Sequence, residues 1–298
     1  MNQITKTIHQ LAAVAGAAAL IIAGSAGAQP NCEDLKVLRF SLVPTQDSIR
    51  ELSYYKPVLD LLSKNTGKKI EFYLPTSYSS VVEALLGKWV DVAVLGPEAY
   101  VIARRKDPNV EVFATYHRAA NGIQAEGPGY KSVLITKKGS KYGSIESLKG
   151  AVLALVDPAS TSGGLIPENA FPKDTKTAAL KQYFSRVIYS GGHDLSAIAV
   201  SEGKVDAAFV ASHRFMETVN AGKVKQDEYN YLWSSTLIPQ DPFVYRAAIC
   251  EDLRKKIADT FLTVDQTPEG RKYLENVKSL KVVKMVDADY NIVREVTK

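Results

Sequence analysis

Short apolar stretches alternate along this chain with longer stretches whose apolar positions recur at helical spacing. "LKVLRFSLVP" has the length and composition of a strand, and "YYKPVLDLLSKNTG" reads as a helix that ends at Gly67. "KKIEFYLP" is the next predicted strand, and "SYSSVVEALLGK", which has hydroxyl capping candidates at its start, is the next predicted helix. "WVDVAVLGP" follows as a continuous apolar run, which is typical of a strand buried in a parallel sheet. This order of elements predicts an α/β fold.

The second half of the chain repeats part of this pattern. A helical stretch, "HDLSAIAVSEGK", leads into the strand-like "VDAAFV", so both halves contain Gly-Lys followed by Val-Asp-x-Ala-x-Val. A match this short also arises by chance or from the pattern common to all α/β chains. It nevertheless favours two doubly wound lobes. The chain is predicted to pass from one lobe to the other near residue 125 and to return near residue 240. This places the first lobe at residues 29–125 and 240–298 and the second at 126–239. A two-segment hinge of this kind predicts a ligand cleft at the carboxyl ends of the strands.

The first residues have the features of a cleaved signal peptide. Lys6 precedes an apolar stretch that is too short to span a bilayer comfortably, and "SAGAQP" offers the small residues Ala26 and Ala28 before a cleavage site. Residues 1–28 are therefore predicted to be removed. Since no later stretch approaches transmembrane length, we expect a soluble, exported protein, and we expect it to be a monomer.

Charge and cysteine content narrow the class of partner. The formal net charge is +5, but the basic residues are scattered, which argues against a nucleic-acid partner. The two cysteines, Cys32 and Cys250, lack the spacing of a metal site. In an oxidising compartment they could pair, and an unpaired role for each is an equally good interpretation.

The common catalytic and cofactor motifs are absent from the sequence. It contains no G-x-S-x-G, H-E-x-x-H or P-loop pattern, and its four histidines show no metal-ligand spacing. We therefore expect a protein that is not an enzyme and that holds no cofactor or metal. The alternative is an exported hydrolase that uses Ser162, His193 and Asp241, although no nucleophile turn supports that triad.

The stretch "DPASTSGGLIP" follows a predicted buried strand at residues 151–156. Its position at the carboxyl end of a strand and its three consecutive hydroxyl residues suit a cradle of donors for an anion. An ordinary capped loop has the same composition. The stretch alone leaves both interpretations open.

The motifs resemble those of the PhnD-type periplasmic binding proteins, which serve ABC importers of phosphonate, phosphite or phosphate. The resemblance rests on "DPASTSGGLIP", "LPTSYSSVVEALLGKWVDVAVLGPEAYV", "GPGYKSVLI", "SGGHDLSAIAVSEGKVDAA" and "SSTLIPQDPFVYR", which occur in the family's order. It implies a type II-like, bilobal periplasmic binding protein that closes on a small phosphorus oxyanion and delivers it to an ABC permease.

The same resemblance implies roles for individual residues. Ser160, Thr161 and Ser162 match the family's oxyanion-binding triplet, and His193 matches a histidine that donates to the same group. The remaining matches are the two tyrosines that close the pocket and the acidic residue at the return crossing, namely Tyr78, Tyr130 and Asp241.

One position departs from the family pattern. Members that take aminoalkyl phosphonates place a glutamate where this chain has His213, so a ligand ammonium would lose its partner. Glu98 is an acidic residue near the first lobe that could replace it. A carboxylate such as Asp241 also repels an oxyanion unless the ligand still carries a proton. Phosphite, phosphate or a small alkylphosphonate is therefore the expected ligand.

A sensor is the main alternative to an importer component. The same fold could bind a phosphorus or arsenic oxyanion and signal to a membrane histidine kinase. A thiol-based arsenite site is disfavoured, because Cys32 and Cys250 lie outside the matched ligand segments.

Overall fold

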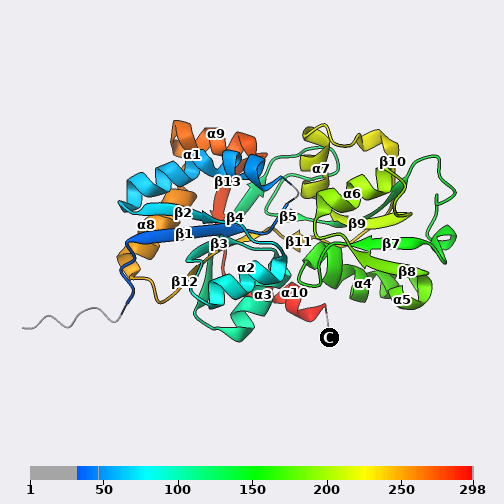
Figure 1. The fold of residues 1–298 in the computed structure, drawn as a ribbon, viewed down its shortest axis with the longest axis horizontal. Helices are drawn as coiled ribbons and strands as arrows, with labels where there is room; N and C mark the ends of the chain where they lie inside the picture. Colours follow the sequence, from blue (N-terminus) through cyan, green and yellow to red (C-terminus); the bar gives the residue numbers. More distant parts are fainter. Residues whose placement is uncertain (1–31, 46, 297–298) are drawn as a thin grey trace, which may run out of the picture. The chain divides into compact units, whose positions relative to one another are not determined.

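A computed structural model describes residues 32–45 and 47–296 of the chain. Two mixed sheets organise these residues (Figure 1). The six-stranded sheet has the order β13-β4-β12-β3-β1-β2 and consists of β1 Val37–Leu42, β2 Lys69–Tyr73, β3 Val92–Val94, β4 Val110–Arg118, β12 Pro242–Arg246 and β13 Ser279–Lys284. The five-stranded sheet has the order β10-β6-β9-β7-β8 and consists of β6 Ser132–Lys137, β7 Val152–Leu155, β8 Arg186–Tyr189, β9 Ala207–Ala211 and β10 Tyr229–Ser234.

Helices cover both faces of each sheet. Those that pack on the six-stranded sheet are α1 Ser48–Thr66, α2 Tyr78–Leu86, α3 Pro97–Lys106, α8 Glu251–Leu262, α9 Pro268–Asn276 and α10 Asn291–Glu295. Those that pack on the five-stranded sheet are α4 Ile166–Thr175, α5 Leu180–Tyr183, α6 His193–Ser201 and α7 Ser212–Asn220. Short helical turns complete the chain: η1 Glu146–Leu148, η2 Thr161–Leu165, η3 Gln226–Glu228, η4 Val264–Gln266 and η5 Asp287–Tyr290.

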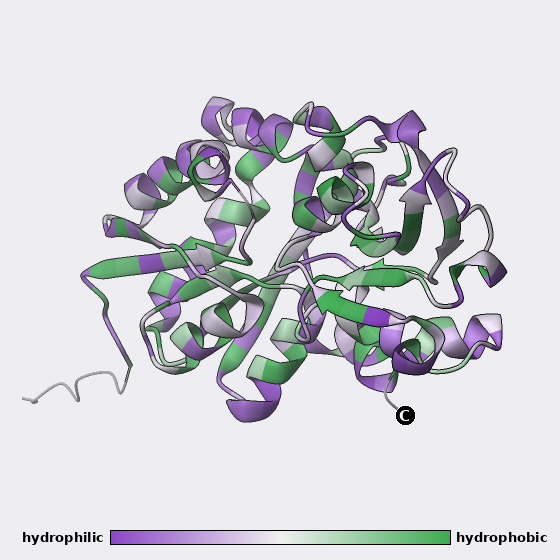
Figure 2. Cartoon of the chain, turned by 45° about the vertical axis from the view of Figure 1, so that its right-hand side comes forward, coloured by the Kyte–Doolittle hydropathy of each residue, from purple (hydrophilic) through white to green (hydrophobic). Residues whose placement is uncertain are grey.

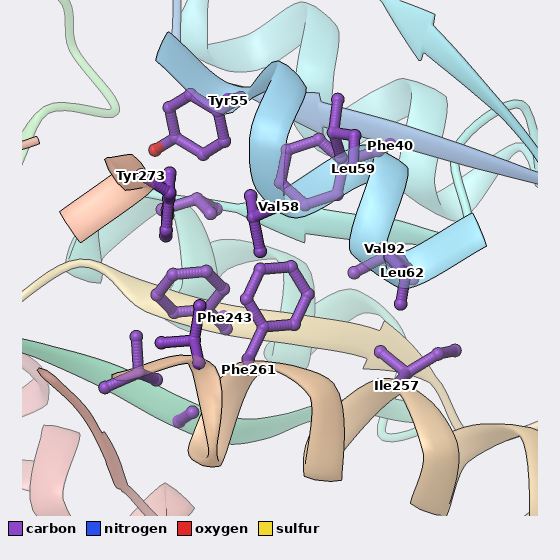
Figure 3. Packing of buried hydrophobic residues seen from close by; sticks show 14 of the residues in the cluster. Phe40, Tyr55, Val58, Leu59, Leu62, Val92, Phe243, Ile257, Phe261 and Tyr273 are labelled. Atoms are coloured by element: carbon purple, nitrogen blue, oxygen red, sulfur yellow. The ribbon is translucent and has the colours of Figure 1, made fainter. Parts of the chain in front are cut away.

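Alternation along the strands explains this two-sided cover. On β3, Val92 and Val94 face a core formed with α1, α8 and α9, whereas Ala93 faces a second core formed with α2 and α3. Figure 3 shows the first of these cores, in which Phe40 of β1 and Phe261 of α8 lie in the same cluster. In Figure 2 the strands are hydrophobic along much of their length and the helices carry the hydrophilic positions. The apolar runs of the sequence are therefore strands buried on both faces.

The predicted helix ends and starts have the expected caps. Gly67 ends α1 in the left-handed conformation, with φ 69°. The start of α2 is a capping box, because the Ser77 hydroxyl accepts from the N–H of Ser80 at 3.0 Å and the Ser80 hydroxyl accepts from the N–H of Ser77 at 3.0 Å. The sequence prediction for this segment is confirmed.

The internal repeat corresponds to two equivalent units. The first is β1-α1-β2-α2-β3 and the second is β7-α4-β8-α6-β9, and in both the first strand lies parallel between the other two. The repeated aspartate accepts a backbone hydrogen bond in both units. Asp91 accepts from the N–H of Arg39 at 2.9 Å, and Asp206 accepts from the N–H of Val152 at 2.8 Å. Each carboxylate thereby joins the segment that enters the third strand to the first strand.

Two chain crossings connect the segments that form the two sheets. β5 Gly129–Tyr130 and β11 Ile238–Pro239 pair in an antiparallel two-stranded sheet. The chain then enters β12, which lies antiparallel to both β3 and β4. The sheets are therefore mixed, with returning strands inserted beside the parallel units, which the apolar pattern alone did not indicate.

Cys32 and Cys250 form a disulfide. It joins positions 218 residues apart and fixes the segment before β1 to the start of α8. Closing a loop of this length restricts the unfolded chain, an effect worth roughly 2–5 kcal/mol. The predicted signal peptide, residues 1–28, lies outside the described residues. Within the described part of the chain, no helix combines the length and the apolar character needed to cross a bilayer.

Candidate functional site

A small cavity with an empty volume of about 210 Å³ lies beside the ends of several strands. Most of its lining residues come a few positions after the carboxyl ends of β2, β3, β7, β8 and β9, as the sequence predicted for a ligand site. We call this space the oxyanion cavity. It is lined by Tyr78, Gly96, Tyr130, Ser160, Thr161, His193, Ala211, His213, Arg214 and Asp241.

The "DPASTSGG" loop is shaped by its own side chains. The Asp157 carboxylate accepts from the N–H of Ala159 at 2.8 Å, and the Ser160 hydroxyl accepts from the N–H of Gly163 at 3.1 Å. These two bonds turn the chain from β7 into η2. Pro167 lies in the first turn of α4, where its missing N–H is tolerated.

Both glycines of this loop are required by close packing. A Cβ on Gly163 would lie 2.3 Å from Val156 Cγ2 and 3.1 Å from His193 Cε1. A Cβ on Gly164 would lie 2.4 Å from the Asp157 carbonyl oxygen. The glycine pair therefore allows η2 to begin directly against β7 and against His193.

Thr161 connects the second unit to the first. Its hydroxyl oxygen accepts from the backbone N–H of Glu98, at the start of α3, at 2.7 Å. The hydroxyl proton remains to be donated elsewhere, and Thr161 lines the oxyanion cavity. A donor that is itself polarised by a helix N-terminus is well suited to an anion.

The other two hydroxyl residues of the triplet have different surroundings. Ser160 lines the cavity, and because its oxygen accepts from Gly163 its proton remains to be donated. Ser162 is buried but does not line the cavity. Its hydroxyl oxygen has no hydrogen-bond partner among the described residues. Ser162 is thus the member of the predicted triplet that the geometry places farthest from a direct contact.

His193 is held in one tautomer. It is the first residue of α6, and its Nδ1 accepts from the N–H of Ala211 at 3.0 Å. Nδ1 must therefore be unprotonated and Nε2 must carry the hydrogen. Burial lowers the pKa of His193 to about 3, so the ring is neutral and donates from Nε2 at neutral pH.

The two predicted tyrosines line the cavity from different elements. Tyr78 is the first residue of α2, and Tyr130 lies in the crossing strand β5. Both are almost fully buried, and burial raises the pKa of each phenol above its usual value. They can therefore act only as neutral hydrogen-bond donors or acceptors.

Asp241 is the only carboxylate among the described residues that line this cavity. Its Oδ2 lies 3.3 Å from Arg214 Nη2 and 3.6 Å from His213 Nε2. Burial alone would raise the pKa of Asp241, but the contact with His213 and the positive charges of Arg214 and Arg118 outweigh it and lower the pKa to about 2. The carboxylate is therefore ionised at neutral pH.

His213 packs edge-to-face on Tyr130, with ring centroids 4.7 Å apart. Burial and the nearby Arg118 lower its pKa, so this ring is also neutral. Neither ring nitrogen has a standard hydrogen bond to any described residue, and the contact of Nε2 with Asp241 is long. Its one N–H donor and its one acceptor nitrogen are therefore both available to a ligand.

Arg214 is a cavity residue that the sequence analysis missed. Its guanidinium contacts three carboxylates: Asp241, Glu51 Oε1 at 3.1 Å and Glu217 Oε2 at 3.1 Å. Arg118 also contacts Glu217, at 3.0 Å. An arginine next to a predicted ligand histidine was visible in "ASHRF", but no motif distinguished it from the scattered surface charges.

A second, larger cavity lies on the other side of three of these residues. Its empty volume is about 760 Å³, and Tyr78, His193 and Arg214 line both spaces. Other lining residues come from α1 and α7, including Glu51 and Tyr55. Glu98, the alternative ammonium partner, lines neither cavity, and burial raises its pKa to about 7.

The alternative Ser-His-Asp triad lacks the required geometry. His193 Nδ1 accepts from a backbone N–H and therefore carries no hydrogen to donate to Asp241, and the Ser162 hydroxyl has no partner among the described residues. No group of three or more His, Cys, Asp or Glu side chains in the described ranges is arranged to hold a metal ion.

Comparison with known proteins identifies the family. A sequence model of the family described as "ABC transporter, phosphonate, periplasmic substrate-binding protein" matches residues 40–290. The chain is 27% identical to the phosphate-import protein PhnD of Mycolicibacterium smegmatis, over 97% of this chain and 95% of the relative. It is 30% identical to the phosphonates-binding periplasmic protein of Escherichia coli, over 82% of this chain and 71% of the relative.

A solved structure agrees with this assignment. The fold matches a binding protein component of an ABC phosphonate transporter from Pseudomonas aeruginosa with a TM-score of 0.78 and 27% identity, over 89% of this chain and 86% of the other. The predicted type II-like binding-protein fold is confirmed, and members of the family bind substrates without transforming them. The chain belongs to the family of periplasmic substrate-binding proteins of phosphonate ABC transporters.

Proposed function

We propose that this protein captures a small phosphorus oxyanion that still carries a proton, and presents it to an ABC importer. Phosphite, phosphate and small alkylphosphonates such as methylphosphonate are the ligand class. The observation that carries the proposal is that several neutral donors and a single ionised carboxylate, Asp241, line one small cavity.

The donors suit the charged oxygens of such a ligand. Ser160 and Thr161 each have a hydroxyl proton left to donate, and His193 donates from Nε2. The first backbone N–H groups of η2 and α6 add donors, since a helix start leaves them without partners inside the helix. We propose that Tyr78, Tyr130 and His213 complete this shell, with Ser162 behind it.

Asp241 suits the oxygen that keeps its proton. Its Oδ2 faces Arg214, whereas no described residue forms a hydrogen bond to Oδ1. An ionised carboxylate can accept a hydrogen bond from a P–OH group, but it repels an oxygen without a proton. Fully deprotonated sulfate is therefore expected to bind poorly although its size is similar.

The names of the relatives support the same ligand class. One relative is a phosphate-import protein and another is a phosphonates-binding protein. The shared chemistry of those ligands is a phosphorus centre with several acceptor oxygens. We infer that the lobes predicted at residues 29–125 with 240–298 and at 126–239 close around it, because Glu98 and Thr161 form a hydrogen bond between them.

Isothermal titration calorimetry on the mature protein tests the proposal. Phosphite, phosphate and methylphosphonate are the test ligands, and sulfate is the matched control. We expect at least one phosphorus ligand to bind and sulfate to bind at least about 100-fold more weakly, the scale of one charged group left without its partner. If a folded protein binds none of the three phosphorus ligands, the proposal fails.

Asp241→Asn sharpens this experiment. The amide can donate where the carboxylate can only accept, so this variant should lose much of the discrimination against sulfate. Asp206→Asn is the control, because it makes the same substitution at a carboxylate that accepts from the N–H of Val152 and lies outside the cavity lining. Equal discrimination in the wild type and in Asp241→Asn would remove Asp241 from the recognition of the protonated oxygen.

A further inference from the structure

The carboxylate of the oxyanion cavity already has a cationic partner inside the protein. Arg214 Nη2 lies 3.3 Å from Asp241 Oδ2, and its Nη1 lies 3.1 Å from Glu51 and 3.1 Å from Glu217. All four groups are largely buried. A buried cluster of this kind is stable only as a complete set, since an uncompensated charge inside a protein is costly.

Among the residues that line the oxyanion cavity, the formal charges cancel. Asp241 contributes one negative charge and Arg214 one positive charge, whereas His193 and His213 are neutral. The remaining field comes from the helix starts at the cavity, which favour negative charge. An ammonium group would meet this positive field, and Asp241 Oδ2 is already occupied by a guanidinium.

Arg214 also lies at the boundary of the oxyanion cavity, where a substituent of the ligand would extend into the larger cavity. Together with Tyr78 and His193 it lines both the oxyanion cavity and the larger cavity beside it. A substituent that extends between the two spaces therefore passes the guanidinium. An uncharged group can pack against it, whereas an ammonium group there meets a guanidinium, and the carboxylates beside it, Glu51 and Glu217, are already paired with that guanidinium.

We propose that Arg214 is a specificity-determining residue, a built-in cation that occupies Asp241 and makes the site select oxyanions with uncharged substituents over those that carry an ammonium. The inference rests on the proposed function and names the substrate class of the same site more closely. It also separates two roles of the carboxylate, since Oδ1 remains for a ligand O–H while Oδ2 is held by the protein.

A pair of isosteric ligands tests charge separately from size. Ethylphosphonate and aminomethylphosphonate have the same number of heavy atoms and differ in a terminal methyl or ammonium group. We expect the wild type to prefer ethylphosphonate. The measurement is the ratio of the two dissociation constants, from calorimetry or from displacement of bound methylphosphonate.

The informative variant is the double substitution Glu51→Gln with Arg214→Gln. It removes a buried acid and its base together, and Glu217 keeps Arg118 as its partner. Asp241 is then open to a ligand cation, so the ratio should move toward aminomethylphosphonate by roughly 10- to 100-fold, the scale of one charge-assisted hydrogen bond. Glu51→Gln alone keeps Arg214 on Asp241 and removes a negative charge, so it should not move the ratio toward aminomethylphosphonate.

Several outcomes would overturn the inference. A wild type that binds both ligands equally, or a folded double variant whose ratio is unchanged, contradicts it. Binding of methylphosphonate but of neither larger ligand to any variant would show that size, not charge, sets the selection. Loss of all binding in the wild type, phosphite and methylphosphonate included, would instead refute the proposed function. Circular dichroism and urea unfolding verify that each variant is folded.

Discussion

The two repeated units have the same order of strands and helices, but the residues at the starts of their helices make different contacts. Tyr78 is the first residue of α2 in the first unit, and His193 is the first residue of the equivalent α6 in the second. The helices that follow the third strands, α3 and α7, are equivalent too, which places Glu98 and His213 at matching positions. All four positions lie at or near one cavity.

Hydrogen bonding distinguishes the two sets of helix starts. In the first unit the N–H of Glu98 donates to Thr161 at 2.7 Å, and the N–H of Tyr78 donates to Asp157 at 3.4 Å. These backbone donors hold the other unit. In the second unit, side chains such as His193 and Arg214 face the cavity. One unit therefore contributes mainly backbone donors to the other unit, and the second contributes most of the polar side chains that line the cavity, although both are built on the same repeat.

The largest expected difference between the units concerns the repeated aspartates. Asp91 is fully buried and also pairs with Arg246 at 2.6 Å, whereas Asp206 is only half-buried. Asp91→Ala should lower the free energy of unfolding by about 3–5 kcal/mol, because it leaves the buried Arg246 guanidinium with Glu33 alone as its acidic partner among the described residues and removes the acceptor of the Arg39 N–H. Asp206→Ala should cost about 1 kcal/mol, the scale of one ordinary hydrogen bond. Urea unfolding measures both, and equal losses would contradict the difference.

Thr161→Val should have the largest effect on binding among the hydroxyl residues. The variant keeps the shape of the side chain but removes both the acceptor for Glu98 and the donor to the cavity. We expect affinity for the phosphorus ligand to fall by about 1–3 kcal/mol, measured by calorimetry. Thr175→Val, at the far end of α4, removes a hydroxyl that bonds only locally and should leave affinity unchanged. An unchanged Thr161→Val would make this hydroxyl purely structural.

Stability should depend on pH through His193, whose counterpart Tyr78 does not titrate in this range. The unfolded ring has a pKa of 6.5 and the native ring about 3, so only the unfolded state gains a proton between these values. The contribution of His193 is therefore full above pH 6.5 and is lost as the pH falls toward 3, by about 1.4 kcal/mol per pH unit. His193→Gln should flatten this dependence in urea unfolding at pH 7, 6 and 5.

The contribution of Glu98 to stability changes with pH in the opposite direction, so a Glu98 variant is the control for the His193 variant. Burial raises its pKa from 4.5 to about 7, so its contribution to stability is present below pH 4.5 and is lost as the pH rises through 7. Glu98→Gln should therefore make the acid loss steeper. If both variants follow the wild-type profile, neither group accounts for the pH dependence.

Tyr78→Phe should have the smallest effect. Tyr78 lines both cavities and supplies its ring to the core, and the variant keeps that ring. Loss of one neutral hydroxyl should weaken binding by about fivefold or less. His193→Phe, at the equivalent helix start, should weaken binding more, because it also leaves the N–H of Ala211 without its acceptor. Equal losses would erase the distinction between the two units.

Much of the fold followed from local patterns. The apolar runs, the caps at Ser77 and Gly67 and the repeated Val-Asp each correspond to a feature of the structure. The division into lobes at residues 125 and 239 stays a prediction, although the pairing of β5 with β11 lies close to both boundaries. The strand order and the antiparallel return of β12 depend on contacts between distant segments, which no local pattern encodes.

The sequence by itself determined which chemistry was available: a hydroxyl triplet after a buried strand, His193 at a helix start, and Asp241 at a crossing. Only the tertiary structure decided how these groups are used. It locked His193 as a donor through Ala211, turned Thr161 into an acceptor for Glu98, and brought Arg214 onto Asp241. Protonation and pairing depend on burial and on partners that are distant in the sequence, such as Arg214 and Glu51, which are 163 residues apart. Those distances exist only once the chain has folded.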